Sequence, residues 1–286
     1  MNKIGNTQLV RLINYEKKNS IKAKLYGKLE FQNPFGSIKD RAAFEIINEA
    51  EKEGLLSNNS CIIEATSGNM GIALAGICQV KGYKCKIIMP ENMSKQRKAL
   101  IQKNGAELIL TPAYLGMQGS IDKAQEIMNN TTNIYYPDQF NNYASIKAHL
   151  NYTSPEIFKQ TDGRIDIIIA GIGTGATISG LGTYFKSIDP SIKIIGVLPA
   201  KHPHKIQGIG AGFEPPLLNR KVLDQIVTVD DRDAFHEADQ IYKTDKLKIG
   251  ISSGAVIAGM KQYIYTNNRN DENIVLIFAD GSDRYK

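Results

Sequence analysis

Short apolar runs alternate with longer amphipathic segments along the chain, and this alternation constrains the fold more than any other feature. Helical patterns at 37–54, 70–82 and 176–188 end in Gly or in a Lys-containing turn, as helices often do. Apolar strands separated by amphipathic helices are typical of parallel sheets covered on both faces. We therefore expect an α/β protein with mostly parallel, twisted sheets. The predicted strands are 24–30, 61–66, 86–90, 107–111, 165–171, 193–199, 225–229 and 273–280.

Two strand-to-helix turns, 64–71 and 170–180, are unusually rich in Gly, Ser and Thr. Such turns place free backbone N–H groups at a helix N-terminus, where an anion binds well. They lie in different halves of a chain of 286 residues, a length that suits one large or two modest domains. We therefore predict two three-layer α/β domains that face each other across a cleft, each contributing one turn.

The second turn also fits the dinucleotide pattern G-x-G-x-x-A through Gly171, Gly173 and Ala176. That pattern needs an acidic residue at the end of the next strand to bind the ribose, but this strand ends in Pro199. A cup for an isolated phosphate fits better, while a nicotinamide-dependent oxidoreductase and a merely tight turn stay open as alternatives. The predicted cup consists of Gly173, Thr174, Gly175, Ala176 and Thr177.

Composition argues against several classes of partner. The net charge is +6, but Lys and Arg are scattered, which disfavours nucleic-acid binding and suits a small anionic ligand. No apolar run approaches the length of a membrane span, and the N-terminus lacks a signal-peptide pattern, so we expect a cytoplasmic protein. The three cysteines and four histidines form no metal-binding motif, so no metal is predicted.

Lys39, in the segment 33–43, lies just inside the start of the helical pattern at 37–54 and is followed by Asp40 and Arg41. Alone, this pattern indicates only a helix with a charged first turn. Together with a phosphate cup, it supplies the amine that an aldehyde cofactor requires, because a lysine can add to the aldehyde and later act as a base. Lys39 is therefore the predicted catalytic residue.

Seven motifs, in order, give the chain a resemblance to a known family. It resembles the cysteine synthases (O-acetylserine sulfhydrylases), pyridoxal-phosphate (PLP) enzymes of fold type II that also include cystathionine β-synthase. The resemblance implies a tryptophan synthase β-like fold with PLP in the cleft between a smaller, mobile domain (40–146) and a larger one (1–39 with 147–286). The motifs are IGNTQLVRL (4–12), KLEFQNPFGSIKDRAA (28–43), EATSGNMGIALA (64–75), DQFNN (138–142), GIGTGATISG (171–180), HKIQGIGAGF (204–213) and GISSGA (250–255).

The same resemblance implies roles for individual residues. Lys39 holds PLP as a Schiff base, Asn69 hydrogen-bonds the ring hydroxyl, and the cup residues 173–177 bind the phosphate. A hydroxyl of Ser252, or alternatively of Ser253, contacts the pyridine nitrogen. The implied substrate contacts are Thr66, Ser67 and Gln139 on the α-carboxylate, Met70 where the family usually has Thr, and Gly210 in an entrance loop over 208–213.

The implied activity is a PLP-dependent β-replacement, in the class of transferases and lyases. The first expectation is cysteine synthase, which converts O-acetyl-L-serine and sulfide into L-cysteine and acetate through α-aminoacrylate. Met70 keeps open an enzyme that consumes L-cysteine and releases hydrogen sulfide, with lanthionine, cystathionine or serine as product. The partners are then a small amino acid and sulfide or a thiol, and a homodimer is expected. An inactive scaffold protein is a further alternative, which the intact Lys39 disfavours.

Overall fold

The computed structural model describes residues 3–268 and 271–285. Its strands form two sheets, and all neighbouring strands are parallel except the antiparallel pair β1–β2. The six-stranded sheet has the order β1 (Leu9–Arg11), β2 (Lys24–Leu29), β10 (Asn273–Phe278), β7 (Ile167–Gly171), β8 (Lys193–Pro199) and β9 (Gln225–Val229). The four-stranded sheet has the order β5 (Glu107–Thr111), β4 (Lys84–Pro90), β3 (Cys61–Ala65) and β6 (Ile134–Tyr135).

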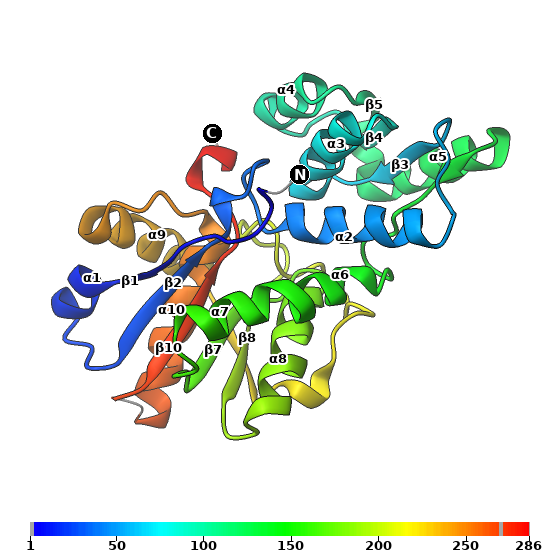
Figure 1. Ribbon diagram of the computed structural model, residues 1–286. Coiled ribbons are helices and arrows are strands. Elements are labelled where there is room, and N and C mark those ends of the chain that lie inside the picture. The colour runs from blue at the N-terminus through cyan, green and yellow to red at the C-terminus, as the bar shows by residue number, and fades with distance from the viewer. Residues whose placement is uncertain (1–2, 269–270, 286) are drawn as a thin grey trace.

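Helices cover both sheets (Figure 1). The four-stranded sheet carries α3 (Asn69–Lys81), α4 (Lys95–Lys103) and α5 (Gly116–Asn130), and α2 (Lys39–Lys52) runs between this unit and the larger one. The larger sheet carries α1 (Ile13–Lys18), α7 (Ser154–Gln160), α8 (Ala176–Ile188), α9 (Asp231–Asp245) and α10 (Ile251–Asn267). The segment between α2 and α7 includes α6 (Ala144–Ala148) and the π-helical turn η3 (His149–Thr153).

Burial explains why these strands read as continuous apolar runs. Ile169 packs in a cluster with residues of α10, whereas its neighbour Ile168 packs on the opposite face with residues of α8. In the smaller sheet, Ile62 and Ile63 also belong to different clusters. Both faces of each sheet are therefore apolar, and the predicted α/β class is confirmed.

Several elements differ from the sequence prediction. The short strands β1 and β6 were not predicted, and α2 begins at Lys39 although its helical pattern begins at residue 37. The domain boundaries at 39/40 and 146/147 stay predictions. None of the helices in the described part of the chain has the length and apolarity that a membrane span requires.

Candidate active site

The loop before α2 holds Lys39 at a fixed place in the fold. The backbone N–H of Ile38 donates to the carbonyl of Ala279 at 2.8 Å, and Ser37 pairs with Asp280 in an isolated β-bridge. The Ser37 hydroxyl accepts the N–H of Lys39 at 3.2 Å. Residues at the carboxyl end of β10 therefore anchor the lysine loop.

The surroundings of Lys39 favour its neutral, nucleophilic form. Burial lowers the pKa of Lys39 to about 8, and the nearby Glu64 carboxyl offsets part of that shift. Glu64 is 2% exposed in β3, and burial raises its pKa to about 8. An amine with a lowered pKa can lose its proton near neutral pH, as Schiff-base chemistry requires.

The predicted phosphate cup follows β7 directly and ends in the first turn of α8. Gly175 has φ +85°, and a Cβ there would meet the Leu218 backbone at 2.8 Å. A Cβ at Gly173 would lie 2.4 Å from the Gly208 carbonyl oxygen. Only glycine fits either position, and the turn leaves the first N–H groups of α8 available for an anion.

Asn69 reaches toward the lysine loop from the start of α3. Its Nδ2 donates to Asp280 Oδ2 at 2.7 Å, and the Asp280 carbonyl accepts the N–H of Gly250 at 2.9 Å, just before α10. Asp280 thus brings together Asn69, the turn that precedes Lys39, and the start of α10. In the described part of the chain, the buried Asn69 Oδ1 has no hydrogen-bond partner.

Ser252 and Ser253 lie in the first turn of α10, near this meeting point. Ser252 is 5% exposed, whereas Ser253 is fully buried and its Oγ has no hydrogen-bond partner among the described residues. Both hydroxyls therefore stay candidates for a contact with the pyridine nitrogen.

Three predicted substrate residues gather around Glu64. Thr66 and Ser67 follow β3, and the Glu64 carboxyl accepts backbone N–H groups of Asp138 and Gln139. Thr66 and Gln139 are buried but keep a small solvent-accessible surface, with 4% and 8% exposure. The two predicted carboxylate-binding segments are therefore held side by side.

Met70 differs from the other predicted substrate residues. Its side chain is 1% exposed and belongs to the apolar core around α3 and β4. The predicted contact of this residue with a substrate stays a prediction, and the burial of its side chain directs attention to its backbone groups.

The predicted entrance loop borders the cup. Gly208, Gly210 and Gly212 all have positive φ, and the N–H of Gly210 donates to the Ile172 carbonyl at 2.9 Å. The Phe213 ring lies 5.3 Å from the Phe140 ring, which comes from the DQFNN segment. This loop therefore contacts the segment that carries Gln139.

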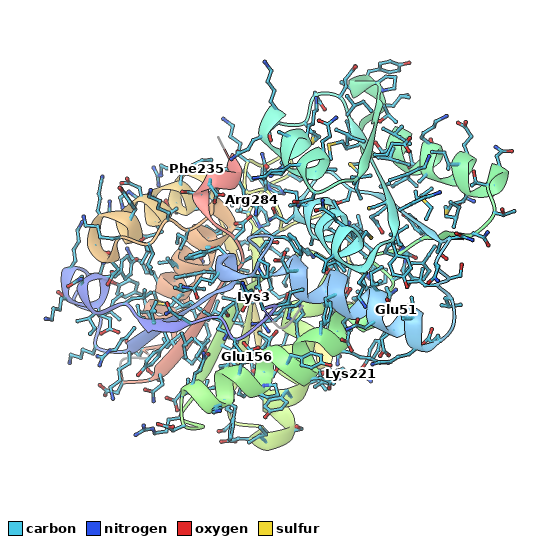
Figure 2. All side chains as sticks on the ribbon, turned by 45° about the horizontal axis from the view of Figure 1, so that its top comes forward. Lys3, Glu51, Glu156, Lys221, Phe235 and Arg284 are labelled. Atoms are coloured by element: carbon cyan, nitrogen blue, oxygen red, sulfur yellow. The ribbon has the colours of Figure 1, made fainter. Side chains whose placement is uncertain are left out.

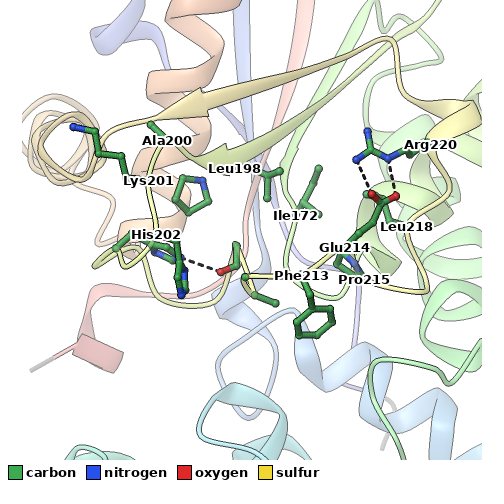
Figure 3. Close-up of a pocket in the computed structure, with 15 residues that line it drawn as sticks. Ile172, Leu198, Ala200, Lys201, His202, Phe213, Glu214, Pro215, Leu218 and Arg220 are labelled. Carbon is green, nitrogen blue, oxygen red and sulfur yellow. Dashed lines mark hydrogen bonds and ion pairs between the residues drawn. The ribbon is translucent and has the colours of Figure 1, made fainter. Parts of the chain in front are cut away.

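A cavity of about 470 Å³ lies beside the entrance loop (Figure 3). Pro199 and His204 line it together with residues 210–215, and the Glu214–Arg220 ion pair lies at its edge. Neither Lys39 nor any cup residue from 173 to 177 lines this cavity. The predicted catalytic lysine and phosphate cup therefore lie outside this cavity.

Sequence reasoning missed a buried ion cluster beside the lysine loop. Arg41 donates to Glu30 at 2.6 Å and to Glu156 at 2.7 Å, and Lys28 donates to Glu156 at 2.9 Å. Glu156, marked in Figure 2, comes from α7, over 100 positions away from the others. Only the position of Arg41, two residues after Lys39, offered a sequence signal.

The residues present fit PLP. Glycines at 173 and 175 let the backbone of the cup come close to a bound phosphate, since a Cβ at either position would collide with neighbouring backbone atoms. The lowered pKa of Lys39 suits an amine that adds to an aldehyde. Asn69 Oδ1 and Ser253 Oγ are buried polar atoms that lack a partner in the described residues, as expected where a polar ring would supply one.

Comparison with known proteins agrees with this geometry. Residues 1–280 match the family described as pyridoxal-phosphate dependent enzyme. The chain is 43% identical to cysteine synthase B of Campylobacter jejuni, over 99% of this chain and 94% of that protein. Among solved structures, a hydrogen sulfide-producing enzyme from Fusobacterium nucleatum superposes with a TM-score of 0.94 at 39% identity, covering 100% and 98% of the two chains. Cysteine synthase from Entamoeba histolytica gives the same TM-score of 0.94 and 39% identity, covering 99% and 87%.

Proposed function

Because the chain belongs to the family of pyridoxal-phosphate-dependent enzymes, we propose that it catalyses β-replacement on a small amino acid, forming L-cysteine from O-acetyl-L-serine and sulfide. The observation that carries the proposal is the convergence of the Lys39 loop, Asn69 and the start of α10 on Asp280. The 43% identity with a cysteine synthase along nearly the whole chain supports the choice of reaction.

Each predicted residue has a task in this proposal. The cup 173–177 would hold the phosphate through its N–H groups and threonine hydroxyls, Asn69 would bind the ring hydroxyl, and Lys39 would hold the cofactor covalently through Nζ. When bound, PLP supplies an electron sink for the negative charge that develops at the substrate Cα.

Lys39 Nζ would then take the Cα proton and return it after the new bond to Cβ has formed. Its lowered pKa of about 8 lets it act as a base near neutral pH. Thr66, Ser67 and Gln139 would bind the α-carboxylate and orient the Cα–H bond toward Lys39. The entrance loop would exclude water from the reacting atoms.

A second candidate is the consumption of L-cysteine with release of hydrogen sulfide. The structural likeness to a hydrogen sulfide-producing enzyme, over the full length of this chain, favours keeping it. Both reactions are β-replacements and use the same residues, so they differ only in the leaving group and the incoming nucleophile.

A donor screen separates the two candidates. We expect the PLP-loaded protein to consume sulfide when given O-acetyl-L-serine, and net sulfide release from L-cysteine would instead identify the second candidate. Lys39→Ala should abolish both activities and the borohydride-stable attachment of PLP. A Lys39→Ala protein that turns over at the parent rate would refute the proposal. The homodimer and the cytoplasmic location stay predictions of the sequence.

A further inference from the structure

His149 lies directly behind the phosphate cup and has no role in the proposal above. It is the first residue of the π-helical turn η3 and is 2% exposed. Its Nε2 lies 3.2 Å from the Thr177 hydroxyl, and its Nδ1 lies 3.0 Å from the Thr153 hydroxyl. Single π-helical turns inside helices occur frequently at functional sites.

The close packing fixes the imidazole against α8. A Cβ at Gly180 would lie 2.7 Å from His149 Cβ, so glycine at this position lets the two segments touch. The Ser154 hydroxyl donates to the His149 carbonyl at 2.8 Å, which ties the backbone of the π turn. The ring therefore has little freedom to turn away from Thr177.

The imidazole is neutral at physiological pH. Burial and the neighbouring Arg41 guanidinium lower the pKa of His149 to about 3, and Lys39 acts in the same direction, while Glu30 and Glu156 oppose the shift. A neutral imidazole has one N–H donor and one acceptor nitrogen, so its two threonine contacts must have opposite directions.

We propose that His149 is a positioning residue that turns the Thr177 hydroxyl proton toward the bound phosphate, an inference that rests on the proposed function. A phosphate offers only acceptor oxygens at neutral pH, so Thr177 must donate its proton to it. The Thr177 oxygen then accepts the Nε2–H of His149, and His149 Nδ1 accepts the hydroxyl proton of Thr153. The cup thus gains an oriented donor without a formal charge at His149.

Substitutions that separate the two ring nitrogens test this assignment. The amide nitrogen of Gln can replace Nε2, whereas the shorter Asn side chain places its amide near the position of Nδ1. We expect His149→Asn and His149→Ala to weaken PLP binding roughly tenfold or more, the effect of one hydrogen bond to a charged group, and His149→Gln to restore most of it. The dissociation constant is measured by titrating the cofactor-free protein with PLP.

A double-mutant cycle distinguishes positioning from a general structural role. Thr177→Val removes the hydroxyl that His149 orients, so adding His149→Asn to Thr177→Val should cause little further loss. The ³¹P NMR signal of bound PLP should shift in His149→Asn and stay near the parent value in His149→Gln. Thr153→Val should cause a smaller loss of PLP affinity. Because it replaces only a hydroxyl by a methyl, it tests the chain of hydrogen bonds from Thr153 through His149 to Thr177 even if His149→Ala unfolds.

The inference is overturned if the losses of the two substitutions simply add, or if His149→Asn and Thr153→Val bind PLP like the parent. Failure of the proposed function gives a different result, because the parent protein itself would then not bind PLP through Lys39. If the parent and the His149 variants bind PLP equally well, only the role of His149 is refuted.

Discussion

Glu30 lies in the buried ion cluster beside the lysine loop, and Glu30→Gln tests how much that cluster stabilises the fold. Glu30 is fully buried and accepts hydrogen bonds from Arg41 Nε at 2.6 Å and Nη2 at 2.8 Å. It also accepts the Thr7 hydroxyl at 2.7 Å. The substitution keeps the size of the side chain and removes its charge.

The magnitude follows from the balance of charges. Glu30 and Glu156 face Lys28 and Arg41, so the substitution leaves one buried positive charge without a counter-charge. Removing one partner of a buried pair costs about 3–5 kcal/mol. Because Glu156 still pairs with Arg41 and is partly exposed, we expect a loss of about 3 kcal/mol in the free energy of unfolding at pH 7.

The loss should depend on pH in a defined direction. Burial acts to raise the pKa of Glu30, but Arg41, Lys28 and Thr7 together outweigh it and hold that pKa below its usual value. A carboxyl with a lowered folded-state pKa stabilises the protein above its unfolded-state pKa, and this stabilisation is lost as the pH falls through the folded-state value. The difference between parent and variant should therefore be full at pH 7 and shrink below about pH 4.3.

Urea unfolding followed by circular dichroism, with both proteins in the same cofactor state, measures this difference. Glu214→Gln is a matched control, because Glu214 and Arg220 form an ion pair of similar geometry, with contacts at 2.6 and 2.8 Å, on the exposed surface. Screening by solvent should make its effect undetectable. Equal losses in the two variants, or a difference that grows in acid, would refute the reasoning.

Three further outcomes follow from the site. Gly173→Ala should weaken PLP binding by about 1–3 kcal/mol, since its Cβ would lie 2.4 Å from the Gly208 carbonyl oxygen, and an unchanged titration would contradict the cup. Arg97 donates to both the Gln207 side chain, at 2.5 Å, and the Ser67 carbonyl, and Gln207→Ala removes the first of these contacts. This substitution should raise KM roughly fivefold with little change in kcat, whereas the control Lys205→Ala should change neither. PLP addition to the cofactor-free protein should speed up as the pH rises and level off above about 8, and a rate that still climbs at pH 10 would show that burial does not lower the pKa of Lys39.

The sequence predicted the elements whose signal is local. The longer strands of both sheets occur where apolar runs indicate them, and the signal is strongest in central strands such as β3 and β7, which are buried on both faces. Strands β1 and β6, with three and two residues, are too short to show any periodicity and exist only through pairing with β2 and β3. Helix α2 starts late because Ser37 pairs with Asp280, a contact that no local pattern contains.

The same distinction holds at the site. Lys39, Asn69 and the cup residues lie at helix starts, which Gly-rich turns reveal. His149 gave no signal, because its partner Thr177 lies in a different helix and its partner Thr153 is reached through a π turn. The role of Glu64 could not be predicted either, since only the fold brings this acidic residue of an apolar strand close to Lys39.

The position of Met70 bears on the choice between the two reactions. The sequence presented Met in place of the usual Thr as the feature that could change the substrate, but the Met70 side chain packs in the core. Because only 1% of this side chain is exposed, we expect it to affect donor choice less than more exposed side chains do. We expect donor choice to arise instead from side chains that keep some exposed surface near Glu64 or in the entrance loop, such as Ser67, Gln139 and Phe213. Accordingly, Met70→Thr should change stability, through a hydroxyl placed in an apolar core, more than it changes the preference between O-acetyl-L-serine and L-cysteine.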